Sequence, residues 1–180
     1  MPELPEVENV VWGLKNKLKN YIITFVDIRV SSLIAFPKVE DFKKDIKNKK
    51  ILDITRRGKY ILFHLSQNKT MVIHLRMTGK LLIKDPEISL DKHTHVIFHL
   101  NTDKELRFNN IRKFGRVYLV NNDDYKNAGG LSELGPEPLA DDFTFDKFKK
   151  KFKNRTANIK ALLLNQKFIA GLGNIYTDEI

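Results

Sequence analysis

The sequence predicts an α+β fold in which one N-terminal helix packs on a mostly antiparallel two-sheet β-sandwich, followed by the start of a helical domain. Three observations support this class. Apolar residues in the first 20 positions recur at three- and four-residue spacing, as on one face of an amphipathic helix. Short apolar runs between residues 22 and 120 alternate like strands and are broken by turn-forming residues. Beyond residue 120 this strand pattern stops.

The expected elements follow one another along the chain. The helix ends near Asn20, and its apolar face carries Val7, Val10, Val11, Leu14 and Leu18. The expected strands are IITFVDIRV (22–30), KILDITR (50–56), KYILFHL (59–65), TMVIHLRM (70–77), KLLIK (80–84), THVIFHL (94–100), KELRFNN (104–110) and GRVYLV (115–120). Short strands at this spacing indicate an antiparallel sandwich or barrel rather than a parallel α/β sheet.

A linker is expected where the strands end. LGPEPLADD (134–142) holds two prolines and few apolar residues, which is typical of a boundary between domains. We therefore expect one domain over residues 1–133 and a second over residues 143–180. A chain of 180 residues is long enough for one large domain or two small ones.

The second domain is expected to be helical and basic. FTFDKFKKKFKNRTANIK (143–160) places Phe145, Phe148 and Phe152 on one helical face, which predicts core packing rather than a platform for stacking nucleic-acid bases. The lysines then face outward. IKALLLNQ reads as another helix, and IAGLGNIYTDEI reads as a glycine turn followed by a helix start.

Composition narrows the class of protein. A hydrophobic content of 42% is enough to bury an ordinary core. No apolar run approaches about 18 residues, and acids stand where a signal peptide carries bases, so we expect a cytoplasmic protein without membrane association. The absence of cysteine excludes disulfides, thiol nucleophiles and cysteine-ligated metals within these residues.

The net charge points to a polyanionic partner. A formal charge of +10 suits binding to nucleic acid or to a membrane surface. A lysine-rich proteome would produce a similar excess of bases, so charge alone leaves these readings open.

The opening stretch MPELPEVENV holds two features that helix formation explains unequally. Pro5 fits the first helical position, and Glu6 and Glu8 complement the positive end of the helix dipole. Pro2 and Glu3 stay unexplained by this reading. Removal of Met1 would leave Pro2 with a secondary amine, and about a tenth of an α-amino group is neutral at pH 7. Such an amine could attack a sugar C1′ and form a Schiff base, while Glu3 moves protons.

Two turns and one loop could also contribute to a site. Lys59 follows a glycine turn in RRGKY, where a solvated lysine is the simpler reading, and Met77 lies beside the turn of HLRMTGKL, where ordinary core packing is the simpler reading. Phe114 in NNIRKFGRV is surrounded by Arg112, Lys113 and Arg116. Apolar wedges beside arginines are used to unstack and kink duplex DNA, and enzymes that act on a base must first extrude it.

Two other motifs give weaker signals. KHTHVIFH carries His93, His95 and His99 on one side of a strand, but no nearby carboxylate or cysteine completes a tetrahedral set, so no metal site is predicted. GLGN resembles a phosphate-cradling turn at a helix N-terminus, although a bare GxG without a preceding strand is weak support.

MPELPEVE, RRGKY, HLRMTGKL, KHTHV, NIRKFGRV, LGPEPL and GLGNIYTDE occur in one chain, and their order and approximate spacing resemble those of the formamidopyrimidine-DNA glycosylases. These are bifunctional base-excision repair enzymes, glycosylase and AP lyase, that remove oxidised purines such as 8-oxoguanine. The related endonuclease VIII group usually begins with a PEGPE form, so PELPE favours the oxidised-purine branch. An endonuclease VIII-like enzyme for oxidised pyrimidines and a catalytically inactive DNA-binding fragment remain the alternatives.

The resemblance implies a role for each matching residue. Pro2 is the implied Schiff-base nucleophile after removal of Met1, Glu3 the acid for glycosidic cleavage, Glu6 a supporting carboxylate, and Lys59 the lysine of β-elimination and of the phosphate beside the lesion. The implied DNA contacts are His74 and His93, the three side chains that fill the hole left by the flipped nucleotide (Met77, Arg112 and Phe114), and the phosphate-binding Arg155 and Asn174.

The resemblance also implies more chain than is present. The family continues with the rest of a helix–two-turn–helix (H2TH) domain and a four-cysteine zinc finger that carries an arginine for δ-elimination, whereas this sequence ends at Ile180 without cysteine. We therefore expect a truncated N-terminal portion, with residues 143–180 as an incomplete H2TH domain and no cofactor, the structural Zn²⁺ belonging to the absent finger. The expected partner is damaged double-stranded DNA, bound by a monomer in the bacterial cytoplasm at the nucleoid.

Overall fold

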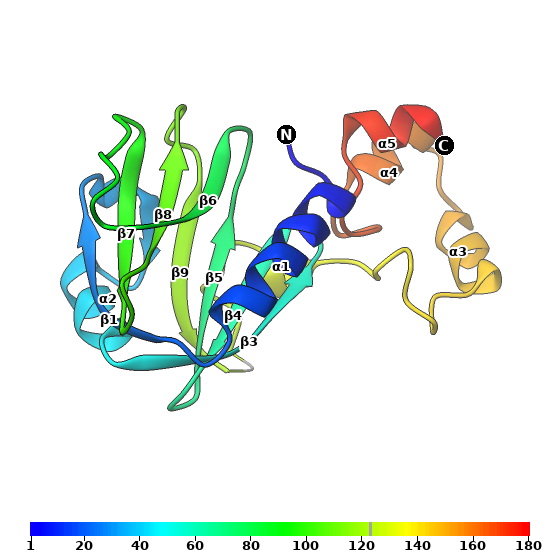
Figure 1. Ribbon diagram of the computed structural model, residues 1–180. Coiled ribbons are helices and arrows are strands. Elements are labelled where there is room, and N and C mark those ends of the chain that lie inside the picture. Colours follow the sequence, from blue (N-terminus) through cyan, green and yellow to red (C-terminus); the bar gives the residue numbers. More distant parts are fainter. Residues whose placement is uncertain (123) are drawn as a thin grey trace.

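The computed structural model describes residues 1–122 and 124–180 and confirms the α+β class (Figure 1). The helices are α1 (Leu4–Leu18), α2 (Val39–Ile46), α3 (Phe145–Phe152), α4 (Ile159–Leu164) and α5 (Asn174–Glu179). The strands are β1 (Ile22–Ile28), β2 (Ile34–Phe36), β3 (Lys49–Arg57), β4 (Tyr60–Leu65), β5 (Lys69–His74), β6 (Gly79–Lys84), β7 (Thr94–Leu100), β8 (Glu105–Asn110) and β9 (Arg116–Asn121). None of the helices in the described part of the chain is both long and apolar enough to cross a membrane.

The strands form two sheets joined at one corner. Their hydrogen-bonded order is β2-β9-β5-β4-β3-β1-β7-β8-β6, and the β1–β3 link in the middle has only two residue pairs. All neighbouring strands are antiparallel except β2 and β9. The main core takes side chains from both halves, including Phe63 from β4 and Phe98 and Phe108 from β7 and β8. The expected sandwich is therefore present.

Helix α1 closes one side of the sandwich and carries the N-terminus. It buries Leu4, Val7, Val11, Leu14 and Leu18, which matches the predicted face except that Val10 is only partly buried. Glu3 is the N-cap residue, so Pro5 occupies the second helical position and not the first. The helix start therefore also accounts for Glu3, which helix formation left unexplained in the sequence, because the Glu3 N–H donates to the Glu6 side chain as in a capping box.

The segment between β1 and β3 was not predicted. It contains β2, which has three residues, and α2, which has eight and buries Phe42 and Ile46 against the main core. Both are too short to give a clear periodic signal in the sequence. Their formation depends on the tertiary contacts that cover their apolar side chains.

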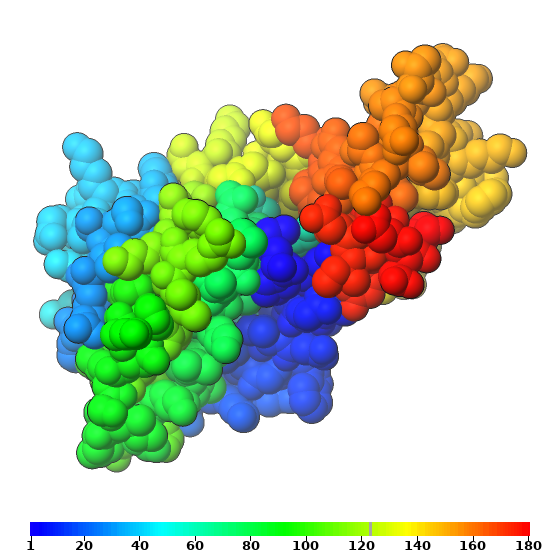
Figure 2. All heavy atoms as spheres, turned by 90° about the horizontal axis from the view of Figure 1, so that it is seen from above, coloured from blue at the N-terminus to red at the C-terminus, as the bar shows by residue number. Residues whose placement is uncertain are grey.

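The C-terminal part of the chain is helical and packs against the N-terminal segment. Figure 2 shows the N-terminal residues directly beside the helix that ends the chain. In the described residues no strand follows Asn121. A separate apolar cluster holds this part together, and its buried members are Leu162, Leu163, Phe168, Ile169 and Leu172.

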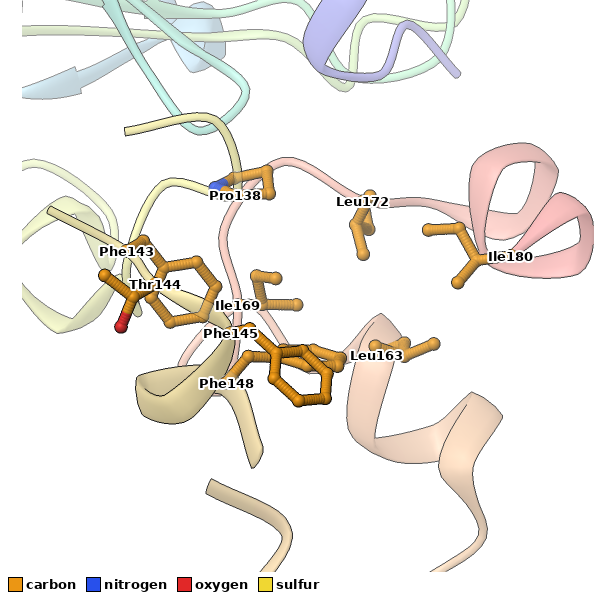
Figure 3. A pocket seen from close by; sticks show the side chains of 9 residues that line it. All are labelled: Pro138, Phe143, Thr144, Phe145, Phe148, Leu163, Ile169, Leu172 and Ile180. Carbon is orange, nitrogen blue, oxygen red and sulfur yellow. The ribbon is translucent and has the colours of Figure 1, made fainter. Parts of the chain in front are cut away.

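One predicted core residue of this part is exposed. Phe148 and Phe152 pack against the helical cluster, but Phe145 is 75% exposed. Phe145 lies at the rim of an apolar hollow of about 280 Å³, lined also by Phe143, Phe148 and Ile180, and the side chains converge on it from α3, α4 and the flanking segments (Figure 3). Phe148 and Phe152 thus supply the contact of α3 with the cluster, and Phe145 at the start of the helix stays mostly in solvent.

Candidate functional site

A cavity of about 340 Å³ lies where the N-terminal segment meets α4 and α5. It is lined by Met1, Glu3, Lys59, Leu164, Gln166, Leu172, Gly173, Asn174 and Ile175. Three of the predicted site residues, Glu3, Lys59 and Asn174, therefore share one cavity, and the half-buried Pro2 lies between two residues that line it. A volume of this size is within the usual range for ligand pockets.

The Glu3 side chain is held by the start of α5. Glu3 is 3% exposed, and its carboxylate accepts hydrogen bonds from the backbone N–H groups of Gly173 (2.6 Å), Ile175 (2.9 Å) and Tyr176 (3.3 Å). The Gly173 N–H of the GLGN turn and two N–H groups from the first turn of α5 thus bind this carboxylate, and the phosphate contact at Asn174 stays a prediction. A Cβ at Gly173 would lie 2.5 Å from the Glu3 carboxyl carbon, so only glycine fits there.

Glu6 completes the link between the two ends of the chain. Its Oε2 accepts a hydrogen bond from the Glu3 N–H at 2.9 Å, and its Oε1 accepts one from the Tyr176 hydroxyl at 3.2 Å. Tyr176 was not identified from the sequence. Burial and the neighbouring Glu6 carboxylate raise the pKa of the Tyr176 phenol, so it keeps its proton at neutral pH.

Lys59 is a buried lysine, and the solvated reading was wrong. It is 5% exposed and stands in the turn between β3 and β4, where it faces the cavity. Burial lowers the pKa of Lys59, and the negative charge of Glu3 only partly opposes this. Lys59 therefore has a larger neutral fraction than a solvated lysine, which suits an amine that accepts a proton.

Glu137, in the segment between β9 and α3, fixes the turn before Lys59. Its carboxylate accepts hydrogen bonds from Arg56 (2.6 Å), Arg57 (2.9 Å) and the Gly58 N–H (2.6 Å). Burial alone would raise the pKa of Glu137, but these three donors together lower it. This role was not predicted, because an acid in LGPEPLADD is typical of a polar linker.

We expect Glu137→Gln to lower the free energy of unfolding by about 2 kcal/mol, because it leaves two guanidinium groups facing an uncharged amide. Denaturant unfolding would measure the change. The matched control is Glu133→Gln, whose partner is Lys167 and whose side chain is 57% exposed against 19% for Glu137. The control should change stability by less than about 0.5 kcal/mol. Equal losses in the two variants would contradict the assignment.

Met77, Arg112 and Phe114 come together on the surface. The Arg112 guanidinium donates to the Met77 sulfur at 3.0 Å and lies over the Phe114 ring at 5.3 Å from its centroid. Met77 is 47% and Phe114 50% exposed, so the core reading of Met77 was wrong. The arrangement offers two apolar side chains and one cation to solvent as a single group.

His74 ends β5 and is 7% exposed. Its Nδ1 accepts a hydrogen bond from the Arg76 N–H at 3.0 Å, and its ring meets Tyr60 edge-on. Burial, with the charges of Arg76 and Lys59, lowers the pKa of His74 to about 3. The ring is therefore neutral at pH 7 and carries its proton on Nε2, which can donate to an anion.

The lowered pKa of His74 makes stability depend on pH. Between pH 6.5 and about 3 the unfolded chain binds a proton that the folded chain does not, so acidification destabilises the fold over this interval. When the pH falls from 7 to 5, the free energy of unfolding should decrease in both proteins. We expect the decrease to be about 2 kcal/mol smaller in His74→Gln than in the unmutated protein. The glutamine can still accept from Arg76, and acidic residues contribute equally to both proteins. Parallel pH profiles would contradict this account.

The two remaining predicted DNA contacts lie outside the cavity. His93 is half-buried and lines a separate hollow of about 110 Å³ near Thr78 and Ile111. Arg155 is exposed between α3 and α4. No group of three metal-ligating side chains occurs among residues 1–122 and 124–180. In the KHTHVIFH strand, Nε2 of His99 lies 2.9 Å from Oδ2 of Asp27.

Comparisons with known proteins cover the whole chain. The family model described as the formamidopyrimidine-DNA glycosylase N-terminal domain matches residues 1–117, and the one described as the formamidopyrimidine-DNA glycosylase H2TH domain matches residues 134–180. Proteins named formamidopyrimidine-DNA glycosylase from Desulforamulus reducens and Pediococcus pentosaceus are 48% and 46% identical, over 99% and 100% of this chain and 65% of each relative.

A solved structure agrees with these matches. The complex between Lactococcus lactis Fpg and DNA containing an abasic site superposes with a TM-score of 0.91 at 34% identity, covering 98% of this chain and 65% of the other. A complex of wild-type Lactococcus lactis Fpg with DNA containing N7-benzyl-Fapy-dG gives the same TM-score at 35% identity. The chain spans about 65% of the length of the relatives that it matches.

Proposed function

Because this chain belongs to the formamidopyrimidine-DNA glycosylase family, we propose that it is a DNA glycosylase and AP lyase that excises oxidised purines from duplex DNA. The observation that carries the proposal is the shared cavity, which places the segment containing Pro2 beside Glu3 and Lys59. An amine, a carboxyl group and a second amine of lowered pKa are the groups that Schiff-base excision requires. Met1 must be removed before the nitrogen of Pro2 can act.

The first step is extrusion of the damaged nucleotide. Met77, Arg112 and Phe114 enter the stack and occupy the space that the nucleotide leaves. His74 and His93 contact the DNA, and Arg155 and Asn174 contact phosphates. Basic side chains supply affinity, and the wedge lowers the cost of unstacking. Because His74 is neutral, its contribution is a hydrogen bond rather than a charge.

The second step replaces the base by the protein. The nitrogen of Pro2 forms a bond to C1′ as the glycosidic bond breaks, and Glu3 takes the proton that the Pro2 amine loses and delivers it to the leaving base. The C1′–O4′ bond then breaks, O4′ takes a proton from solvent, and the opened sugar is an iminium ion on Pro2. Glu6 supports the segment during this change. β-Elimination then removes a C2′ proton and breaks the bond between C3′ and its phosphate, with Lys59 as the base and phosphate contact. Hydrolysis of the iminium releases Pro2.

Each predicted domain is proposed to have its own role. We assign the chemistry to residues 1–133, the connection to residues 134–142 and DNA binding to residues 143–180, acting as a monomer in the bacterial cytoplasm. These 180 residues contain no cysteine and so cannot supply the ligands of a four-cysteine zinc site. No step is therefore assigned to zinc.

Oxidised pyrimidines are the second candidate substrate. One structural relative is a complex of wild-type Lactococcus lactis Fpg with DNA containing an oxidised pyrimidine, at 35% identity and a TM-score of 0.91. Duplexes carrying 8-oxoguanine and thymine glycol would be compared for strand nicking and for borohydride trapping. We expect faster excision of 8-oxoguanine. Faster excision of thymine glycol would reverse the assignment, and salt-sensitive binding without nicking or trapping of either duplex would leave only a DNA-binding module.

We expect Phe114→Ala to slow excision from a paired duplex on the order of 10- to 100-fold, because unstacking then proceeds without the wedge. A lesion placed opposite a gap, where the base is already unstacked, should be excised with a much smaller loss. The control is Phe25→Ala, since Phe25 is 48% exposed on β1 but stacks on His99 away from the wedge. Equal losses on both substrates would argue against a wedge.

A further inference from the structure

Tyr176 joins α5 to both carboxylates of the N-terminal segment. Its hydroxyl donates to Glu6 Oε1 at 3.2 Å, and its backbone N–H donates to Glu3 Oε2 at 3.3 Å. These contacts span 170 and 173 positions of sequence. The proposed steps give Tyr176 no part, although it is the side chain from α5 that bonds to Glu6.

Glu6, which the Tyr176 hydroxyl holds, is connected to the nitrogen of Pro2 through a single peptide group. Glu6 Oε2 accepts the hydrogen bond of the Glu3 N–H at 2.9 Å, and that N–H belongs to the peptide group between Pro2 and Glu3. A peptide group is planar, so orienting its N–H also orients the carbonyl and Cα of Pro2. The ring nitrogen of Pro2 is then left with rotation about one backbone bond, between its Cα and its carbonyl carbon.

We infer that Tyr176 is a positioning residue, which acts through Glu6 to hold the Pro2 nitrogen at the cavity. The catalytic role of Tyr176 rests on the proposed function, whereas its hydrogen bonds to Glu3 and Glu6 are independent of that function. Effective attack requires the amine within about 3–3.5 Å of C1′ and correctly aligned, so a loosened segment costs rate rather than binding.

A purely structural role for Tyr176 would come from its ring. The ring packs against the cluster of Leu162, Phe168 and neighbouring apolar residues, whereas the hydroxyl points to Glu6. Tyr176→Phe keeps the ring and removes only the hydroxyl, so it separates the two roles. The pKa of the Tyr176 phenol is raised, so the hydroxyl stays protonated at neutral pH and can keep donating its hydrogen bond to Glu6.

The kinetic test compares single-turnover excision of 8-oxoguanine by the Met1-free protein and by Tyr176→Phe. We expect the rate to fall about 10-fold, the scale of one hydrogen bond to a charged group, with an unchanged dissociation constant for DNA. Tyr21→Phe is the matched control, because Tyr21 is also a half-buried tyrosine and lies just before β1, outside the proposed site. A rate within twofold of the unmutated protein, or a loss confined to DNA affinity, would overturn the inference.

A double-mutant cycle tests the route through Glu6. If Tyr176 acts by holding Glu6, then Tyr176→Phe should lower the rate by less than about twofold in a Glu6→Ala background, which has no side-chain acceptor for the hydroxyl. Equal losses in the presence and absence of the Glu6 carboxylate would show that the hydroxyl acts elsewhere.

A measurement without DNA keeps the inference separate from the proposed function. Hydrogen exchange of the Glu3 backbone amide, followed by NMR, reports the bond to Glu6 directly. We expect Tyr176→Phe to speed this exchange about 10-fold and Tyr21→Phe to leave it unchanged. Unchanged protection in Tyr176→Phe overturns the positioning role even if the enzyme is active. Faster exchange in a protein that neither excises nor traps DNA would support the contact and refute the proposed function.

Discussion

Protein that retains Met1 should form no borohydride-trapped complex with an abasic-site duplex, whereas the same sequence beginning at Pro2 should be trapped. The two forms differ in one group, because the nitrogen of Pro2 is an amide in the first and a secondary amine in the second. An amide nitrogen cannot form an iminium ion, so we expect trapping to fall on the order of 10³-fold or more. Gel mobility of the trapped complex measures it.

The two forms can be prepared by cleaving a fusion protein at either position. DNA affinity at several salt concentrations serves as the control and should be the same for both, because the phosphate contacts are unchanged. The pair should also be prepared with the remaining part of the Lactococcus lactis relative appended, since this chain spans 65% of that protein. Equal trapping of both forms would exclude the nitrogen of Pro2 as the nucleophile.

Glu3→Gln should lower the rate of base excision on the order of 10²- to 10⁴-fold, because the leaving base then lacks its proton donor. Trapping on a duplex that already contains an abasic site needs no base departure and should fall much less. Single-turnover assays on the two substrates give the comparison. The glutamine oxygen can still accept from the N–H groups of Gly173 and Tyr176, which both bond to Oε2 of Glu3, so only the bond from the Ile175 N–H to Oε1 is lost.

The control for this substitution is Glu40→Gln, an exposed glutamate on α2 that pairs with Lys43. It should leave both rates within twofold. If Glu3→Gln slowed both substrates equally, Glu3 would be holding the N-terminal segment against α5 rather than delivering a proton. Thermal unfolding of both variants would show whether the contact with α5 survives.

The parts of the fold with repetitive local patterns were predictable. α1 and the strands from β3 to β9 carry clear periods of apolar residues, and the structure confirms them within a few positions. β2 and α2 were missed because each is short and depends on its neighbours. Phe145 was assigned to the core because a helical stripe shows which residues share a face and does not show whether anything covers that face.

The site was predictable only residue by residue. The motifs identified Glu3, Lys59 and Asn174, but their convergence on one cavity depends on α5 packing against the N-terminus, a contact between residues about 170 positions apart. Burial of Lys59 and the roles of Glu137 and Tyr176 follow from the same packing. A linker acid and a helix tyrosine have no distinctive sequence context, so no local pattern could reveal them.

The central claim is that the nitrogen of Pro2 forms the covalent bond to DNA, and the site of the trapped adduct tests it most directly. Lys59 is the alternative amine, since it lines the same cavity and burial lowers its pKa. Intact mass before and after borohydride treatment would report both removal of Met1 and adduct formation, and proteolysis of the complex would locate the adduct. We predict that only Met1-free protein gains mass and that the adduct lies on Pro2. An adduct on Lys59, or trapping of protein that still carries Met1, would contradict the account.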